Sequence, residues 1–332
     1  MAAVGSTISA NDYNLIRDKI IAVMGAGGTN PSSGSTDLSF GYNQTTSSVA
    51  GVSAVTTITK SQFDNLRFDI LNAKLHQDGT TPTITTANVG DVINYSATSP
   101  IFQYETISDQ AIANRFNIGS GYYSVAAAQT SYTGSTLTAP TYVGGWSSSI
   151  SNEITVTWPS SSAMRYFFNS GGRIIFSCSF VPSLANSQNT VWQNTLSNAG
   201  TQSFGAISSG SGAVNFYNLT TSFQTWYTGV SSAPYASNQW LLRVKVASGS
   251  CTTSSVTATS IVFRFEWNDG YTDPGGPPPG DLAQGTVTLN VDEQYAGSPS
   301  GISLLPTVSP PAIQPVWTVT RPLYTATAIT GS

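Results

Sequence analysis

A duplicated segment in the first hundred residues constrains the fold more than any other feature of the sequence. Residues 7–17 (TISANDYNLIR) recur as residues 57–67 (TITKSQFDNLR), so a similar order of hydroxyl, polar, aromatic and aliphatic side chains occurs twice. Each copy offers the backbone the same start signal and the same apolar spacing, so each should form the same local structure. We therefore expect two matching elements within an N-terminal region of residues 1–100.

Each copy begins with residues typical of a helix N-terminus. In the first copy, the Ser9 hydroxyl can cap the helix and Asp12 can accept a bond from the Ser9 backbone, which together make a capping box. Thr59 and Gln62 occupy the same positions in the second copy. The sequence thus predicts a pair of repeated amphipathic helices.

An apolar stripe follows each start signal at helical spacing. Its members are Tyr13, Ile16, Ile20 and Val23 in the first copy, and Phe63, Leu66 and Ile70 in the second. Two such stripes need a surface to cover them. We predict that they form a docking interface for a neighbouring subunit; a helical hairpin that only supports the chain's own fold would use the same residues.

Residues 101–273 show short apolar runs separated by Gly, Ser and Asn. The alternation in residues 153–158 and the apolar runs in residues 173–180, 238–246 and 261–267 are typical of strands with a buried face. Several short strands with turn signals between them favour an antiparallel β-sandwich body. The fold class is therefore expected to be mainly β, with the helix pair at the N-terminus.

A Pro/Gly-rich run at residues 274–280 separates the predicted sandwich from the last part of the chain. Proline cannot donate to a strand ladder and glycine lacks stiffness, so we expect a linker here. Residues 281–332 are expected to form a small C-terminal β module. A module of about fifty residues buries too little surface for an independent core, so it should dock onto its neighbour or take part in an oligomer.

The composition points to a folded protein with unusually few charges. Charged residues make up 8% of the chain, against about 25% in typical soluble domains, while hydrophobic residues make up 39%. Disorder is not expected, because disordered chains combine low hydrophobicity with high net charge. A formal net charge of −4 gives weak repulsion between copies, which suits a protein packed many times in one particle.

Several classes of function are not expected from this composition. The sequence has no run of basic residues, so we expect no direct binding to nucleic acid. It has no apolar stretch of membrane-spanning length and no secretory signal pattern, so we expect no membrane insertion and no signal peptide.

Candidate catalytic groups are few. The only histidine, His76, lies at the end of the second predicted helix, where a residue that can carry positive charge suits the helix dipole. Glu266, Asp269 and Asp273 form an acidic cluster that could serve a hydrolase or bind calcium, but an ordinary Asn-Asp-Gly turn explains it better. The sequence therefore predicts no enzyme, no cofactor and no metal site.

Cysteine and aromatic side chains are expected inside the fold. Cys178 lies within an apolar run, which favours a buried thiol over a bridge to Cys251. Some aromatic residues of the β body could stack on sugars, but filling a sandwich core is the favoured interpretation. These residues are Trp192, Trp226, Tyr227 and Trp240.

Several motifs that carry no evident chemistry are distributed along the chain. They lie at residues 8–15, 41–44, 63–70, 74–79, 165–174, 189–192, 198–201 and 269–273. Through these motifs the chain resembles, over nearly its whole length, virion structural proteins from tailed phages of cyanobacteria and other aquatic bacteria. The motifs of that family bring no catalytic residues with them.

The resemblance implies a structural component of a phage virion, assembled in the host cytoplasm and located in the particle. We expect a tail-, baseplate- or fibre-associated subunit that docks through its N-terminal helices, contacts other virion structural proteins and forms a homo-oligomer. The main alternative is a tail fibre or adhesin that binds a receptor, such as a host surface glycan, through the β body. A capsid or neck decoration protein is a further alternative, and a depolymerase is the most distant one.

Overall fold

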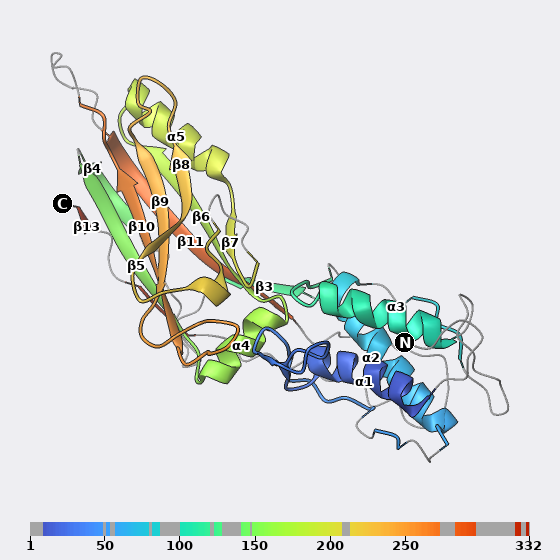
Figure 1. The fold of residues 1–332 in the computed structure, drawn as a ribbon. Helices are drawn as coiled ribbons and strands as arrows, with labels where there is room; N and C mark the ends of the chain where they lie inside the picture. Colours follow the sequence, from blue (N-terminus) through green and yellow to red (C-terminus); the bar gives the residue numbers. More distant parts are fainter. Residues whose placement is uncertain are drawn as a thin grey trace. The chain divides into compact units, whose positions relative to one another are not determined.

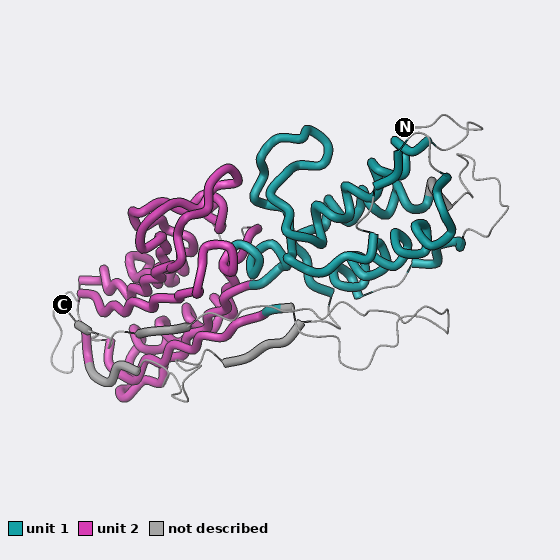
Figure 2. The backbone as a smooth tube through the Cα atoms, turned by 90° about the horizontal axis from the view of Figure 1, so that it is seen from below, with its two compact units in different colours: residues 1–124, 165–172, 295–319 teal, residues 125–164, 173–294, 320–332 magenta. Residues whose placement is uncertain are grey.

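The chain divides into two compact units, which are coloured separately in Figure 2. The computed structural model of the protein describes residues 9–48, 51–53, 57–79, 82–86, 100–119, 123–127, 141–146, 148–207, 213–272, 283–296, 323–326 and 330–331. The helical unit comprises residues 1–124, 165–172 and 295–319, and the sandwich unit comprises residues 125–164, 173–294 and 320–332. Each unit is therefore built from segments that are far apart in the sequence.

Three helices form the body of the helical unit (Figure 1). They are α1 (Ala10–Met24), α2 (Lys60–Asp78) and α3 (Pro100–Ala113). The predicted capping boxes are confirmed, because the Ser9 hydroxyl accepts a bond from the Asp12 N–H and the Thr59 hydroxyl accepts one from the Gln62 N–H. Helix α2 ends at Gly79, whose φ of 72° is in the left-handed region that favours glycine.

Two segments that were predicted to lie in the β body belong to the helical unit. Helix α3 packs against both α1 and α2. The second half of α4 (Ser161–Asn169) also belongs to this unit, within residues 165–172, which we call the α4 insert. The structure thus differs from the predicted boundary at residue 100. The physical reason is that two helices leave one side of each apolar stripe open, and α3 covers it.

The sandwich unit contains two antiparallel sheets. The first has the strand order β12-β5-β10-β9-β8, with β13 also pairing with β5; its strands are β5 (Ser149–Thr157), β8 (Gln224–Val230), β9 (Gln239–Val246), β10 (Ser260–Asn268), β12 (Leu323–Ala326) and β13 (Thr330–Gly331). The second has the order β3-β11-β6-β7, with β4 also pairing with β11; its strands are β3 (Tyr123–Ala127), β4 (Thr141–Trp146), β6 (Arg173–Pro182), β7 (Gln202–Phe204) and β11 (Ala283–Ala296).

Aromatic rings fill the space between the two sheets. Phe176 of β6 packs on Phe263 and Phe265 of β10, with ring centroids 4.7 and 5.0 Å apart. Helix α5 (Ser187–Ala199) connects β6 to β7, and a short 3-10 helix, η1 (Phe216–Asn218), precedes β8. The antiparallel, sandwich-like part of the predicted fold class is confirmed. Among the residues that the structure describes, helices contribute about as many as strands, so "mainly β" is only a rough description.

The described C-terminal strands belong to the sandwich. Strand β11 starts in the region predicted as a separate module, yet it pairs with β6 from Gly285 to Gln294. Strands β12 and β13 pair with β5. A segment this short gains its hydrogen bonds and apolar contacts by completing a larger sheet. The predicted linker at residues 274–280 lies outside the described residues.

Candidate functional site: a buried polar cluster in the helical unit

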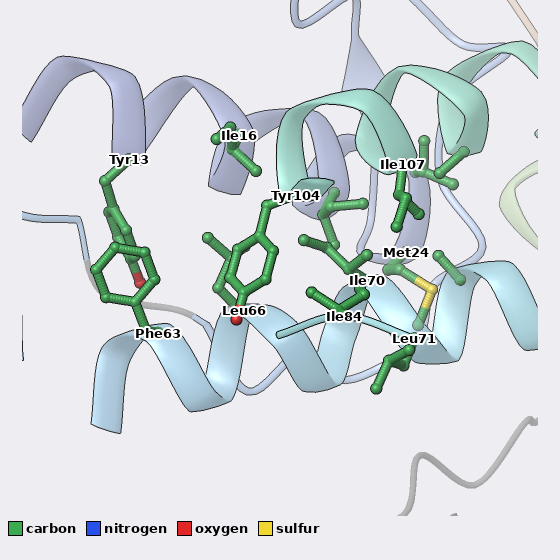
Figure 3. Packing of buried hydrophobic residues seen from close by; sticks show 14 of the residues in the cluster. Tyr13, Ile16, Met24, Phe63, Leu66, Ile70, Leu71, Ile84, Tyr104 and Ile107 are labelled. Carbon is green, nitrogen blue, oxygen red and sulfur yellow. The ribbon is translucent and has the colours of Figure 1, made fainter. Parts of the chain in front are cut away.

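The residues predicted as a docking interface lie in the core of the helical unit (Figure 3). Each is at most 2% exposed; they are Tyr13, Ile16, Ile20, Val23, Phe63, Leu66 and Ile70. Tyr104 and Ile107 of α3 belong to the same cluster of packed side chains. The structure thus assigns the two stripes to the chain's own fold, and they offer no surface to another subunit.

Helix α3 was not predicted, although the sequence carries a signal for it. Tyr104, Ile107 and Ala111 follow the same spacing as the first three stripe residues of α1, an aromatic residue followed at i+3 and i+7 by aliphatic ones. The Phe63 and Tyr104 rings lie 6.0 Å apart between centroids. A search for the stripe alone, without the capping signal, would have identified this third helix.

Two backbone segments of the helical unit cross at Gly27 and Gly41. Their φ angles are +60° and +106°, both in the region that favours glycine. A Cβ atom on Gly27 would lie 2.2 Å from the carbonyl oxygen of Phe40, and a Cβ atom on Gly41 would lie 2.5 Å from that of Ala26. Both positions therefore require glycine, for close backbone approach as well as for conformation.

The α4 insert satisfies the carbonyl groups around this glycine crossing. The Arg165 guanidinium donates to the carbonyl oxygens of Ala26 (2.9 Å) and Phe40 (3.2 Å). The Asn169 amide nitrogen lies 3.1 Å from the carbonyl oxygens of both Phe40 and Gly41. Both side chains are buried. One turn of helix thus binds backbone oxygens that would otherwise be costly to bury.

His76 joins α2 to the α4 insert. Its Nε2 atom lies 2.8 Å from the carbonyl oxygen of Ser170, so the neutral ring donates this bond from Nε2. Its ring lies 4.8 Å from that of Tyr42, and its carbonyl oxygen accepts a bond from the Gly119 N–H. Burial lowers the pKa of His76 from 6.5 to about 4, although the bond to Ser170 favours the protonated ring. The ring is therefore neutral at pH 7.

A second set of bonds surrounds Tyr42. Its hydroxyl donates to the carbonyl oxygen of Arg115 (2.6 Å) and accepts from the Gln77 amide (2.8 Å), which also donates to the carbonyl oxygen of Ala111. Burial raises the pKa of Tyr42 well above its usual value. This tyrosine is therefore a neutral, hydrogen-bonded core residue, and an active-site acid would need a group that ionises more readily.

Motif segments from three parts of the sequence meet in this cluster. They are residues 41–44, residues 74–79 and residues 165–172. They share hydrogen bonds between side chains and backbone, and none of these contacts leaves a nucleophile next to a base. The arrangement can fix the loop after α1, the end of α2 and the α4 insert to one another.

Asp69 is a further buried ionisable group of the helical unit. Its carboxylate accepts bonds from the Ser47 N–H, the Ser48 N–H and the Ser48 hydroxyl. Burial raises the pKa of this carboxyl, although the three donors favour the charged form. The contacts hold the loop before residue 49 against α2, which is a structural role.

The predicted acidic cluster is divided by the structure. Asp269 is buried and accepts a bond from the Gln188 amide (2.6 Å) and one from the Tyr271 N–H. Glu266 forms an ion pair with Arg243 on the sheet. Asp273 lies outside the described residues. The structure therefore supports the turn interpretation for Asp269, and the two described acids do not share a site.

Charged side chains gather on the outward face of the first sheet. Arg264 of β10 stands opposite Arg243 of β9 and Glu153 of β5. Arg264 pairs with Glu153, and the Phe223 ring lies 3.9 Å from its guanidinium carbon. Arg243 pairs with Glu266 at 3.3 Å. Such partly exposed pairs each contribute at most about 1 kcal/mol, so their main effect is to keep this face of the sheet hydrated.

The aromatic and cysteine residues largely follow the core interpretation. Trp192, Trp226 and Trp240 are fully buried, and Tyr227 is partly buried and packs on Trp240. Cys178 and Cys251 are both buried and unbridged. These tryptophans are therefore not available to stack on sugars.

Comparisons with known proteins give no further assignment. No protein-family model, no curated protein and no solved structure matches the chain. Within the described ranges, no three His, Cys, Asp or Glu side chains come together as metal ligands. None of the helices among those residues is long and apolar enough to cross a membrane.

Proposed function

We propose that the protein is a structural subunit of a phage virion, associated with the tail, the baseplate or a fibre. One observation carries the proposal: motif segments through which the chain resembles virion structural proteins converge in the buried cluster around the glycine crossing. Residues used in this way build a fold, which is what a family of structural subunits would have in common.

The placement of the reactive groups supports the same role. His76, Asp269 and Cys178 are buried and have hydrogen-bonding or packing roles inside the fold. A catalytic group would have to reach a substrate, and these side chains do not. The low charge of the chain adds support, since it limits repulsion between packed copies.

Contacts with other subunits then have to use surfaces other than the two apolar stripes. The stripes are enclosed within α1, α2 and α3. We propose that homo-oligomer contacts and contacts with other virion proteins use the outward faces of the two units.

Cryo-electron microscopy of intact particles tests the proposal. We expect density that fits the two-sheet sandwich in the tail, the baseplate or a fibre. Density in the capsid or neck would keep the virion role and reject the tail assignment. Complete particles with no density for the sandwich would reject both.

Receptor binding is the second candidate, and the outward face of the first sheet favours it. There Lys245 lies on β9 with Arg243, and Arg264 lies opposite on β10; each arginine is paired with a glutamate, and Phe223 packs against Arg264 and Lys245. Cationic and aromatic groups of this kind can bind acidic sugars. Binding of the full chain to host cells that is lost in Arg243→Ala but kept in Arg173→Ala would favour this candidate.

A further inference from the structure

A buried hydrogen bond joins His76 of α2 to the α4 insert. The chain contains one histidine, and its side chain is only 2% exposed. The ring nitrogen Nε2 donates to the carbonyl oxygen of Ser170, so the only side chain with an ordinary pKa near neutrality contacts a segment inserted from the β body.

The surroundings of His76 do not favour a positive charge. The Tyr42 ring packs against the His76 ring at an interplanar angle of 50°, and the Tyr42 hydroxyl is hydrogen-bonded to the Gln77 amide and the Arg115 carbonyl. The charged groups on the elements packed here are Arg165 of the α4 insert, Arg115 after α3, and the Lys74–Asp78 ion pair of α2. A protonated imidazole would lose its hydration at this buried position, which is the main cause of the lowered pKa.

We propose that His76 acts as an acid-sensitive latch, whose protonation releases the α4 insert from the rest of the helical unit. In the closed state the insert is held by His76 and by the bonds of Arg165 and Asn169 to the glycine crossing. In the open state His76 reaches water and binds a proton at an ordinary pH. This inference does not depend on the virion role.

The direction of the pH effect follows from the two states. The pKa of His76 is lower when the latch is closed, about 4, than when the ring is exposed, 6.5. The contribution of neutral His76 to the free energy of the closed state is therefore fully present above pH 6.5, and it is lost as the pH falls towards 4. The ratio of open to closed molecules should rise roughly 30-fold between pH 7.5 and pH 5.

Hydrogen exchange of the full-length protein, corrected for the intrinsic effect of pH on exchange, measures this opening. The amides of Ser170, Gly171 and Gly172 are hydrogen-bonded within the insert, and the Gly119 amide is bonded to His76 itself. A helix as short as α4 is marginal on its own, so release of the insert should also open these bonds. We therefore expect the protection of the four amides to fall roughly 30-fold at pH 5, while amides of β9 and β10 keep theirs.

His76→Gln is the matched variant, because its amide can still donate to Ser170 and does not titrate. It should show the same protection at both pH values, which also separates the latch from Asp69, the other buried ionisable group. An equal loss in wild type and variant, or no loss in wild type, would overturn the proposal. If the variant does not fold, an NMR titration of wild-type His76 decides: a pKa near 6.5 without loss of protection overturns the latch, and a depressed pKa with loss of protection supports it.

Discussion

The rings of Tyr13 and Phe63, which hold the same position in the two copies of the N-terminal repeat, pack edge to face with their centroids 5.6 Å apart. The Tyr13 hydroxyl also donates to the carbonyl oxygen of Gln62, at the start of the second copy. The two copies therefore pack on each other inside one molecule. With α3, they make a three-helix core that encloses both apolar stripes.

Removing a stripe side chain should destabilise the helical unit itself. Ile20→Ala leaves a cavity at a fully buried position and should lower the free energy of unfolding by about 2–5 kcal/mol. Ile21→Ala is the matched control, because this neighbour on the same helix is only partly buried and should cost less than half as much. Urea denaturation followed by circular dichroism measures both. Equal costs would mean that the Ile20 side chain is not in the core.

The glycine crossing gives a second comparison between like substitutions. Gly34→Ala places a side chain at a φ of +70° with nothing within 4 Å, so it should cost only about 1–2 kcal/mol of conformational strain. Gly41→Ala adds a clash with the Ala26 carbonyl and should cost about 3 kcal/mol or more. Thermal unfolding of the two variants measures the difference. A Gly41 variant as stable as the Gly34 variant would argue against the crossing.

The helix pair and the main strands could be predicted from the sequence because their signals are local. The Ser9 capping box and the alternation before Trp158 lie within a few residues of the elements that they define. The α4 insert could not be predicted in this way. Arg165 and Asn169 are bonded to carbonyl groups more than 120 positions earlier. Every residue has a backbone carbonyl, so the sequence does not indicate which carbonyls these side chains will bind. The pairing of β11 with β6 is likewise long-range.

The side chains of the α4 insert should stabilise the protein through their hydrogen-bond donors, and a positive charge alone should not replace them. Arg165→Lys keeps the charge but loses the planar fork that reaches Ala26 and Phe40, so it should cost about 1–3 kcal/mol. Asn169→Ala should cost a similar amount. Arg173→Lys, at the start of β6, is the control and should stay within about 0.5 kcal/mol. Wild-type stability in Arg165→Lys would show that the carbonyl contacts are dispensable.

Both cysteines should resist modification in the native protein. Burial raises the pKa of Cys178 and of Cys251 to about 12, so almost no thiolate forms at pH 8, and neither sulfur is open to a reagent. We expect slow reaction with a thiol reagent before unfolding and two fast equivalents afterwards. A native protein that reacts at once, or an unfolded one without free thiols, would contradict the two buried, unbridged cysteines.

The most direct test of the structural role is to count this chain in purified particles. Quantitative mass spectrometry with labelled reference peptides, applied to particles from a density gradient, gives the number of copies per particle. The proposed role predicts the same copy number in every preparation, with a matching loss of the chain from the free protein of the lysate. A chain that is abundant in the lysate and absent from complete particles would contradict the proposal.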